Sequence, residues 1–290
     1  MFYNICADDS FLYCLDFYND TILKAYPQTG FPAMARYATK GQGPDDLILP
    51  FFTREIVQKG GNIKMTDVNA WSLREINPTR STRIHLNTTR LPIVPMMQDY
   101  AETDLYIYGT NIDSPECLFF IYDKSKQKVK DIRYWDEKQL KSKYPDTHIP
   151  FLFTGNLLLH PERGICRTMN NLNSLFFFDL QGELLKEVVI GTERIWSEAD
   201  PQFLDFPQAN KYVLSLTGNQ ECLYILYNGY PANTQGACSK ILLFDREGNL
   251  LKAIQTDRDL SQIALTPDEN CLYAIANNEE GGTDVVRITF

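Results

Sequence analysis

Histidine is scarce in this sequence, which limits the acid–base and metal chemistry that the chain can support. Its 290 residues include three histidines, His85, His148 and His160. No two of them show the His-x-His or His-x-x-x-His spacing at which two imidazoles on one strand or helix reach the same metal ion. The sequence therefore argues against a zinc hydrolase or a histidine-dependent lyase. Each histidine is expected to be a hydrogen-bonded structural or surface side chain.

Cysteine is the other common nucleophile and metal ligand, but its distribution points to buried thiols. The seven cysteines form no Cys-x-x-Cys pair, and the sequence contains no Gly-x-Ser-x-Gly elbow. Six of the seven lie in or beside apolar, strand-like runs, which favours free thiols over a disulfide framework or a zinc site. Cys222 and Cys271 each precede a Leu-Tyr pair, so both are expected to be buried and unpaired.

Aspartate recurs at the ends of apolar runs, where a carboxylate can bind a metal ion or cap a turn. The recurring residues are Asp16, Asp67, Asp123, Asp179 and Asp245. Because the same residue type stands at strand ends in successive repeats, we expect these carboxylates to cap turns.

Two recurring sequence themes predict the elements that carry these residues. The segments 178–186 and 244–252 share an Asp followed three residues later by Gly, which is typical of a tight hairpin turn. A Leu-Tyr pair recurs at 12–13, 105–106, 223–224 and 272–273, with weaker copies at 63–64 and 165–166. The copies lie about fifty residues apart, a spacing that predicts six β-propeller blades of four strands each.

The chain is therefore predicted to be all-β, with residues 1–290 forming a single six-bladed propeller domain. Several expected strands are apolar on both faces, as in a blade that lies between two others. Only 136–143 has the pattern of even a short helix, so an alternating α/β sheet is not supported. The second strands are expected at 12–16, 63–67, 105–109, 165–169, 223–227 and 272–276, and the third strands at 21–26, 71–76, 118–123, 175–179, 241–245 and 285–290.

The two ends of the chain give a sharper prediction. Residues 2–7 are expected to be the innermost strand of the first blade, and the sixth blade reaches residue 290 within its third strand. Blades three to five have fourth strands expected at 128–135, 184–191 and 250–256. We therefore expect a three-stranded last blade with an exposed edge at 284–290. We also expect the natural gene product to begin upstream with the closing strand and an export signal, since the chain as given carries no signal peptide.

One segment resembles a known family. Gly41-Gln42-Gly43-Pro44-Asp45-Asp46-Leu47, followed by Pro50, Gly60-Gly61-Asn62-Ile63, Asp67 and Asn69, resembles the NHL-type repeat. More narrowly, Gly-Gln-Gly-Pro after the first blade is similar to the TolB-like six-bladed propeller proteins common in Bacteroidetes, although Asp46 stands where those proteins more often carry Glu. The resemblance implies an exported protein, in the periplasm or at the cell surface, and it implies no particular activity. No helix follows the glycines, so we expect a kinked connector and not a phosphate-binding loop.

Three long insertions, at 136–151, 192–210 and 228–239, are expected on one face of the propeller. They carry or adjoin several aromatic residues, and exposed aromatic rings on loops favour contact with a ligand. We predict a non-catalytic binding or scaffold protein that recognises a glycan or a peptide; packing of the loops against one another is the competing interpretation. The predicted ligand-binding residues are Trp135, Tyr144, Trp196, Phe203 and Tyr230.

The alternative function is a metal-dependent hydrolase or lactonase with its site at the mouth of the central channel. Glu55 and Asp99, on expected inner strands, are the candidate oxygen ligands for calcium. The favoured function, a non-catalytic binding or scaffold protein, predicts no catalytic residue, no metal site and no cofactor.

Net charge and hydropathy exclude some partners. Lys and Arg number 28 against 37 Asp and Glu, giving a net charge of −9 that works against binding nucleic-acid phosphates or anionic lipid surfaces. Uninterrupted apolar runs are far shorter than the roughly 20 residues of a membrane helix, so no transmembrane segment is expected.

Overall fold

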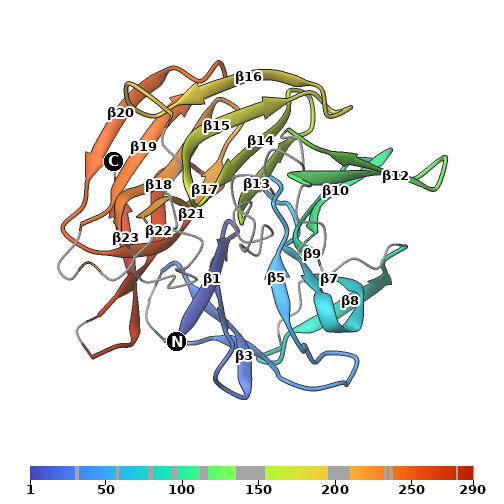
Figure 1. Ribbon diagram of the computed structural model, residues 1–290. Coiled ribbons are helices and arrows are strands. Elements are labelled where there is room, and N and C mark those ends of the chain that lie inside the picture. The colour runs from blue at the N-terminus through green and yellow to red at the C-terminus, as the bar shows by residue number, and fades with distance from the viewer. Residues whose placement is uncertain are drawn as a thin grey trace, which may run out of the picture. The chain divides into compact units, whose positions relative to one another are not determined.

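The protein is an all-β, six-bladed β-propeller, as predicted, and its described residues form five four-stranded antiparallel sheets and one three-stranded sheet (Figure 1). The computed structural model describes residues 1–29, 33–56, 59–77, 81–92, 97–111, 117–134, 154–194, 210–231, 234, 238–278 and 280–289. The one helical element among them is a single 3-10 turn, η1 (Val68–Ala70). None of the described helices is long and apolar enough to cross a membrane.

The strands group into two compact units, and the first, Met1–Val94 with Leu260–Phe290, contains blades 1, 2 and 6. Its buried core includes Leu15, Leu23, Met65 and Ile84. Blade 1 consists of β1 (Phe2–Ala7), β2 (Phe11–Asp16), β3 (Thr21–Pro27) and β4 (Arg36–Thr39); blade 2 of β5 (Pro50–Phe52), β6 (Lys64–Asp67), β7 (Ser72–Asn77) and β8 (His85–Arg90); blade 6 of β21 (Leu260–Leu265), β22 (Cys271–Asn277) and β23 (Thr283–Thr289).

The second unit, Pro95–Asp259, contains blades 3, 4 and 5. Its core packs Phe119 against Phe178 at a ring-centroid distance of 5.0 Å, with Leu157 and Phe176 fully buried beside them. Blade 3 consists of β9 (Met97–Glu102), β10 (Tyr106–Asn111), β11 (Phe119–Asp123) and β12 (Lys128–Ile132); blade 4 of β13 (Gly155–His160), β14 (Gly164–Met169), β15 (Leu172–Phe178) and β16 (Leu184–Val189); blade 5 of β17 (Asn210–Gly218), β18 (Cys222–Pro231), β19 (Lys240–Asp245) and β20 (Leu250–Gln255).

Most strand boundaries agree with the sequence prediction to within a few residues, and two differ for identifiable reasons. Strand β18 continues to Pro231, so the first residues of the expected 228–239 insertion pair with β17 as a hairpin extension. Trp71, expected to open a third strand, instead ends η1 with a left-handed backbone, and β7 begins one residue later. The helix expected at 136–143 lies outside the described residues.

Blade 6 has three strands within the described residues, as predicted. Strand β1 pairs with β2 as the first strand of blade 1, and β23 pairs with β22 alone.

The repeated aspartates cap turns at four of the five positions. Asp179, for example, accepts hydrogen bonds from the backbone N–H groups of Gln181 and Glu183, and Gly182 has the expected positive φ of 83°. Asp16, Asp123 and Asp245 accept bonds from their own turns in the same way. Asp67 differs because its buried carboxylate accepts the N–H groups of 48 and 49, which belong to the connector between blades 1 and 2.

None of the seven cysteines, all of which lie in the described part of the chain, forms a disulfide bond. Cys271 is buried, as predicted, but the prediction of burial is wrong for Cys222, which is partly exposed because it opens β18 beside a turn. Cys14, Cys117 and Cys166 are buried, whereas Cys6 and Cys238 are partly exposed.

Candidate functional site

The structure describes only one of the five predicted ligand-binding residues. Trp135, Tyr144, Trp196 and Phe203 lie outside the described residues. Tyr230 lies on β18 directly opposite Lys211 on β17, and it is partly buried. Burial raises the pKa of its phenol, an effect that the hydroxyl of Ser239 partly offsets. Tyr230 is therefore a strand residue, and not the loop-tip residue that was expected.

The residues considered for metal chemistry do not form a metal centre in the described part of the chain. No group of three His, Cys, Asp or Glu side chains lies close enough there to share an ion. Glu55 belongs to the first unit and Asp99 to the second, where Asp99 is buried and its backbone N–H donates to the Thr110 hydroxyl at 3.0 Å.

Two of the three histidines are hydrogen-bonded as predicted, and His148 lies outside the described residues. The buried ring of His160 accepts the N–H groups of Glu162 and Arg163 at Nδ1, both at 3.1 Å. Burial lowers the pKa of His160, and the positive charges of Arg246 and Arg163 lower it further. His85 bonds through Nδ1 to Asp45 at 2.8 Å.

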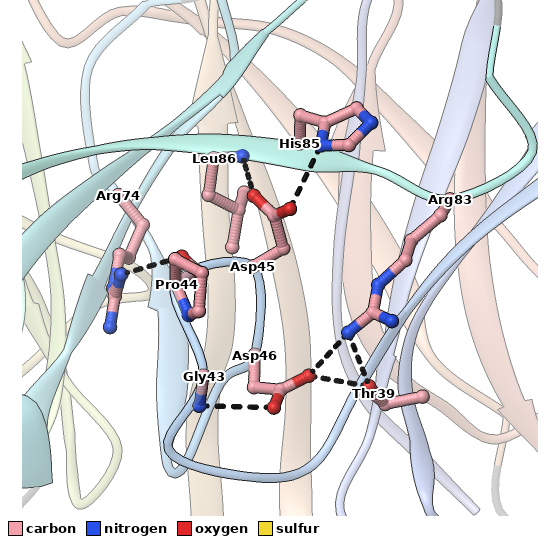
Figure 2. Close-up of polar contacts among 9 residues, drawn as sticks. All are labelled: Thr39, Gly43, Pro44, Asp45, Asp46, Arg74, Arg83, His85 and Leu86. Carbon is pink, nitrogen blue, oxygen red and sulfur yellow. Dashed lines mark hydrogen bonds and ion pairs between the residues drawn. The ribbon is translucent and has the colours of Figure 1, made fainter.

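The glycine-rich segment is a tight connector between blades 1 and 2 (Figure 2). Backbone bonds from Gly41 to Leu47 and from Leu47 to Thr39 close the loop, and Arg74 donates to the carbonyl of Pro44. Asp46 accepts the Thr39 hydroxyl at 2.6 Å, the Gly43 N–H at 3.0 Å and the Arg83 guanidinium at 2.9 Å. The prediction of a kinked connector therefore fits the observed geometry.

Asp45 and Asp46 point to opposite sides of this connector (Figure 2). Asp45 turns toward β8, where it accepts the N–H of Leu86 at 2.9 Å and contacts the His85 ring. These two contacts hold the pKa of Asp45 below its ordinary value, and the Thr39 hydroxyl, Gly43 N–H and Arg83 do the same for Asp46. The network anchors the connector to blade 2.

Exposed aromatic rings lie at the turn between β2 and β3. Tyr18 is 77% exposed, and Phe17 beside it is 39% exposed. Phe17 makes edge contacts with Tyr3 and with Tyr18, and the Lys40 ammonium lies 4.4 Å from the centre of its ring. Phe17 is thus held from several sides, while Tyr18 faces solvent.

The corresponding turn of blade 2 exposes Trp71. Its side chain is 47% exposed, and its backbone has φ 50° and ψ 45°, in the left-handed region that costs a non-glycine residue roughly 1–2 kcal/mol. The backbone is held on both sides, since its N–H donates to the carbonyl of Val68 and its carbonyl accepts the N–H of Leu91. A bulky aromatic residue held in a glycine-like conformation is uncommon, and such strain is concentrated at functional sites.

These turns lie at one edge of blades 1 and 2, with the connector between them. Lys40 donates its N–H to the carbonyl of Asp20 in the first turn, and Val68 donates to Leu49 beside the second. We call the exposed side chains of this edge the aromatic turn surface. It consists of Phe17, Tyr18, Lys40, Gln42, Asn69 and Trp71.

None of the residues of the aromatic turn surface is among the predicted ligand-binding residues. The available signal was an aromatic residue inside each short turn that follows a strand-ending Asp, as in Asp16-Phe17-Tyr18 and Asp67-Val68-Asn69-Ala70-Trp71. The prediction of ligand-binding residues rested on the long insertions, and the aromatic residues of these short turns also fit a strand pattern.

Comparison with known proteins establishes the fold. No protein-family model matches the sequence, and no curated protein matches it either. Among solved structures, a streptogramin B lyase is similar with a TM-score of 0.51 and 11% identity, over 99% of this chain and 82% of that one. A catalytically inactive histidine-to-alanine variant of virginiamycin B lyase from Staphylococcus aureus, solved with quinupristin, has a TM-score of 0.51 and 12% identity, over 99% and 83%. At these identities the likeness concerns the fold alone.

Proposed function

We propose that this propeller is a binding protein whose aromatic turn surface takes a neutral oligosaccharide. The observation that carries the proposal is Trp71, an exposed indole held in a strained left-handed backbone conformation. Strain of this kind persists where the surrounding structure maintains it, and here both backbone groups of Trp71 are hydrogen-bonded.

The chemistry of the surface favours a sugar over a charged ligand. Flat aromatic faces such as Tyr18 and Trp71 suit the apolar C–H faces of pyranose rings, and the exposed amides of Gln42 and Asn69 suit hydroxyl groups. The Lys40 ammonium already lies over the face of the Phe17 ring. The buried carboxylate of Asp16 is neutralised by the Lys24 ammonium at 2.8 Å.

Tyr3 packs against Phe17 and fixes the position of that ring within the surface. Tyr3 donates its hydroxyl to the carbonyl of Pro50 at 2.6 Å and places its ring against both Phe17 and Phe51. Burial and the nearby carboxylates of Asp67 and Asp16 raise the pKa of Tyr3, so it remains a neutral donor. A ring held in this way loses little conformational entropy on binding.

Glycan-array screening followed by calorimetry with cellohexaose, xylohexaose, maltohexaose and N-acetylchitohexaose tests the proposal. We expect one of these to bind, and Trp71→Ala and Tyr18→Ser each to weaken binding about tenfold or more. Leu105→Ser is the matched control, because Leu105 is 61% exposed at the turn between β9 and β10, outside the surface. Binding that both aromatic substitutions leave unchanged would contradict the proposal, and release of shorter sugars would identify an enzyme instead.

A further inference from the structure

Two neighbouring side chains on β7 carry polar atoms that no described residue satisfies. Ser72 is 3% exposed and Arg74 is 8% exposed, so both are more than nine-tenths buried. The Ser72 hydroxyl and the Arg74 Nε have no hydrogen-bond partner in the described part of the chain. Buried polar atoms are nearly always hydrogen-bonded, and a buried charge is costly unless it is paired. These two donors are therefore available to a ligand.

The register of β7 with β8 places two further polar side chains beside this pair. Side chains two residues apart on a strand share a face, and residues that pair across two strands share it too. Arg90 pairs with Ser72 and Thr88 pairs with Arg74, so each strand contributes one hydroxyl and one guanidinium. We call Ser72, Arg74, Thr88 and Arg90 the β7–β8 basic group. Thr88 and Arg90 are exposed, so the group is accessible from solvent.

The hydrogen bonds of Arg74 use only part of its guanidinium. Through Nη1 it donates to the Pro44 carbonyl at 3.2 Å and to the Thr88 hydroxyl, and both acceptors are neutral. Arg83, which approaches the connector from the other side, differs because it has the Asp46 carboxylate as an ionic partner (Figure 2). The bond to Pro44 helps to hold the connector, but it leaves the Nε of Arg74 unpaired and its charge uncompensated.

The β7–β8 basic group carries an excess of positive charge. Neither Arg74 nor Arg90 forms an ion pair with a described residue. Asp67 on β6 lies opposite Ser72 on the same face, but its two oxygens accept backbone N–H groups of the connector. Two guanidinium charges therefore stand against one carboxylate, and that carboxylate is bound elsewhere. The face attracts a further anion.

We propose that the β7–β8 basic group binds a tetrahedral oxyanion, phosphate or sulfate, either free or as an ester. Guanidinium groups match the oxygens of such ions in geometry and charge, and hydroxyl groups donate to the remaining oxygens. The available donors belong to three side chains, Ser72, Arg74 and Arg90, on two strands. That arrangement suits an ion with four oxygens better than a carboxylate with two. The group shares no residue with the aromatic turn surface.

Calorimetric titration with sodium phosphate and sodium sulfate tests the proposal, with sodium chloride at the same ionic strength as the reference. We expect saturable binding with a Kd below about 1 mM. Because a hydrogen bond to a charged group is strong, Arg74→Gln and Arg90→Gln should each weaken binding roughly tenfold or more. Ser72→Ala removes a single hydroxyl and should weaken it about fivefold.

Arg133→Gln and Thr89→Ala are the matched controls. Arg133 is an exposed arginine of blade 3 that pairs with Asp131, and Thr89 lies on β8 but on the face opposite to Thr88. Both variants should keep the native affinity for phosphate. Methyl phosphate distinguishes the two sources of the ion. Affinity equal to that for phosphate indicates an ester, and binding about tenfold weaker indicates the free ion; both results support the site.

Two results would overturn the inference. One is the absence of saturable binding of both ions at about 10 mM. The other is native affinity in Ser72→Ala, Arg74→Gln and Arg90→Gln, which would place the ion elsewhere on the protein. If Arg74→Gln fails to fold because the connector loses its bond at Pro44, the other two variants keep the test decisive, since neither side chain bonds to the described connector.

Discussion

The two glycines of the connector are required by the position of the Asp46 carboxylate. A Cβ atom on Gly43 would lie 2.7 Å from Asp46 Oδ2, and one on Gly41 would lie 2.6 Å from it, both too close for a carbon–oxygen contact. Gly43→Ala therefore forces the carboxylate to move away from the Gly43 N–H that it accepts at 3.0 Å. The perturbation is steric and acts through Asp46.

The expected loss of unfolding free energy follows from the hydrogen bonds and the ion pair that each substitution removes. A hydrogen bond to a charged group contributes about 1.5–3 kcal/mol, and an exposed ion pair such as Asp46–Arg83 contributes at most about 1 kcal/mol. Asp46→Ala loses the bonds from Thr39 and Gly43 together with that ion pair, so we expect a loss of about 3 kcal/mol in unfolding free energy. Gly43→Ala should cost about 2 kcal/mol in the native background, because it disturbs one bond and strains the rest.

A double-mutant cycle measured by urea unfolding checks this reasoning. In the Asp46→Ala background the clash is gone, so Gly43→Ala should change the free energy of unfolding by less than about 0.5 kcal/mol. Gly60→Ala is the control, because Gly60 has a φ of +72° with no atom within 4 Å of a Cβ, and its cost should be the same in both backgrounds. Additive effects of Gly43→Ala and Asp46→Ala would refute the steric explanation.

Three further predictions concern other parts of the chain. At Trp71, glycine should give a protein about 1 kcal/mol more stable than alanine in urea unfolding, because the backbone is left-handed; greater stability of the alanine variant would contradict that conformation. The folded-state pKa of His160 is lowered, so stability should fall as the pH drops below about 6.5, and His160→Gln should flatten the profile; equal pH profiles would contradict this. Iodoacetamide mapping of the native protein should modify Cys222 and Cys238 well before Cys166, whose thiol pKa burial raises to about 12, and early labelling of Cys166 would show that the blade core is open.

The fold was predictable because its signals are local and repeated. The Leu-Tyr theme marks second strands, and Asp with a following Gly marks hairpins, so the number of blades followed from the spacing of these repeats. The sequence did not predict a further repeat, which is a threonine on the second strand that bonds to the backbone of the first strand of the same blade. It occurs at Thr66, Thr110 and Thr168. Isolated threonines are too common for the sequence to reveal that role.

The candidate site was less predictable, because residue type does not determine side-chain exposure or backbone strain. Trp71 fits a strand pattern, and only the structure shows its positive φ. Asp67 looks like another turn cap, yet its carboxylate holds the connector. The role of Asp46 depends on Arg83, which is distant from it in the sequence but donates a hydrogen bond to its carboxylate.

The most direct test of the proposed function uses the three tryptophans, Trp71, Trp135 and Trp196, as reporters of where a sugar binds. In Trp135→Phe/Trp196→Phe, Trp71 is the sole indole, and titration with the oligosaccharide selected by the array should change its fluorescence with the affinity found by calorimetry. The reciprocal variant Trp71→Phe should give little change. If the signal instead follows Trp135 or Trp196, and Trp71 does not respond, the ligand binds at the long insertions and the aromatic turn surface is not the site.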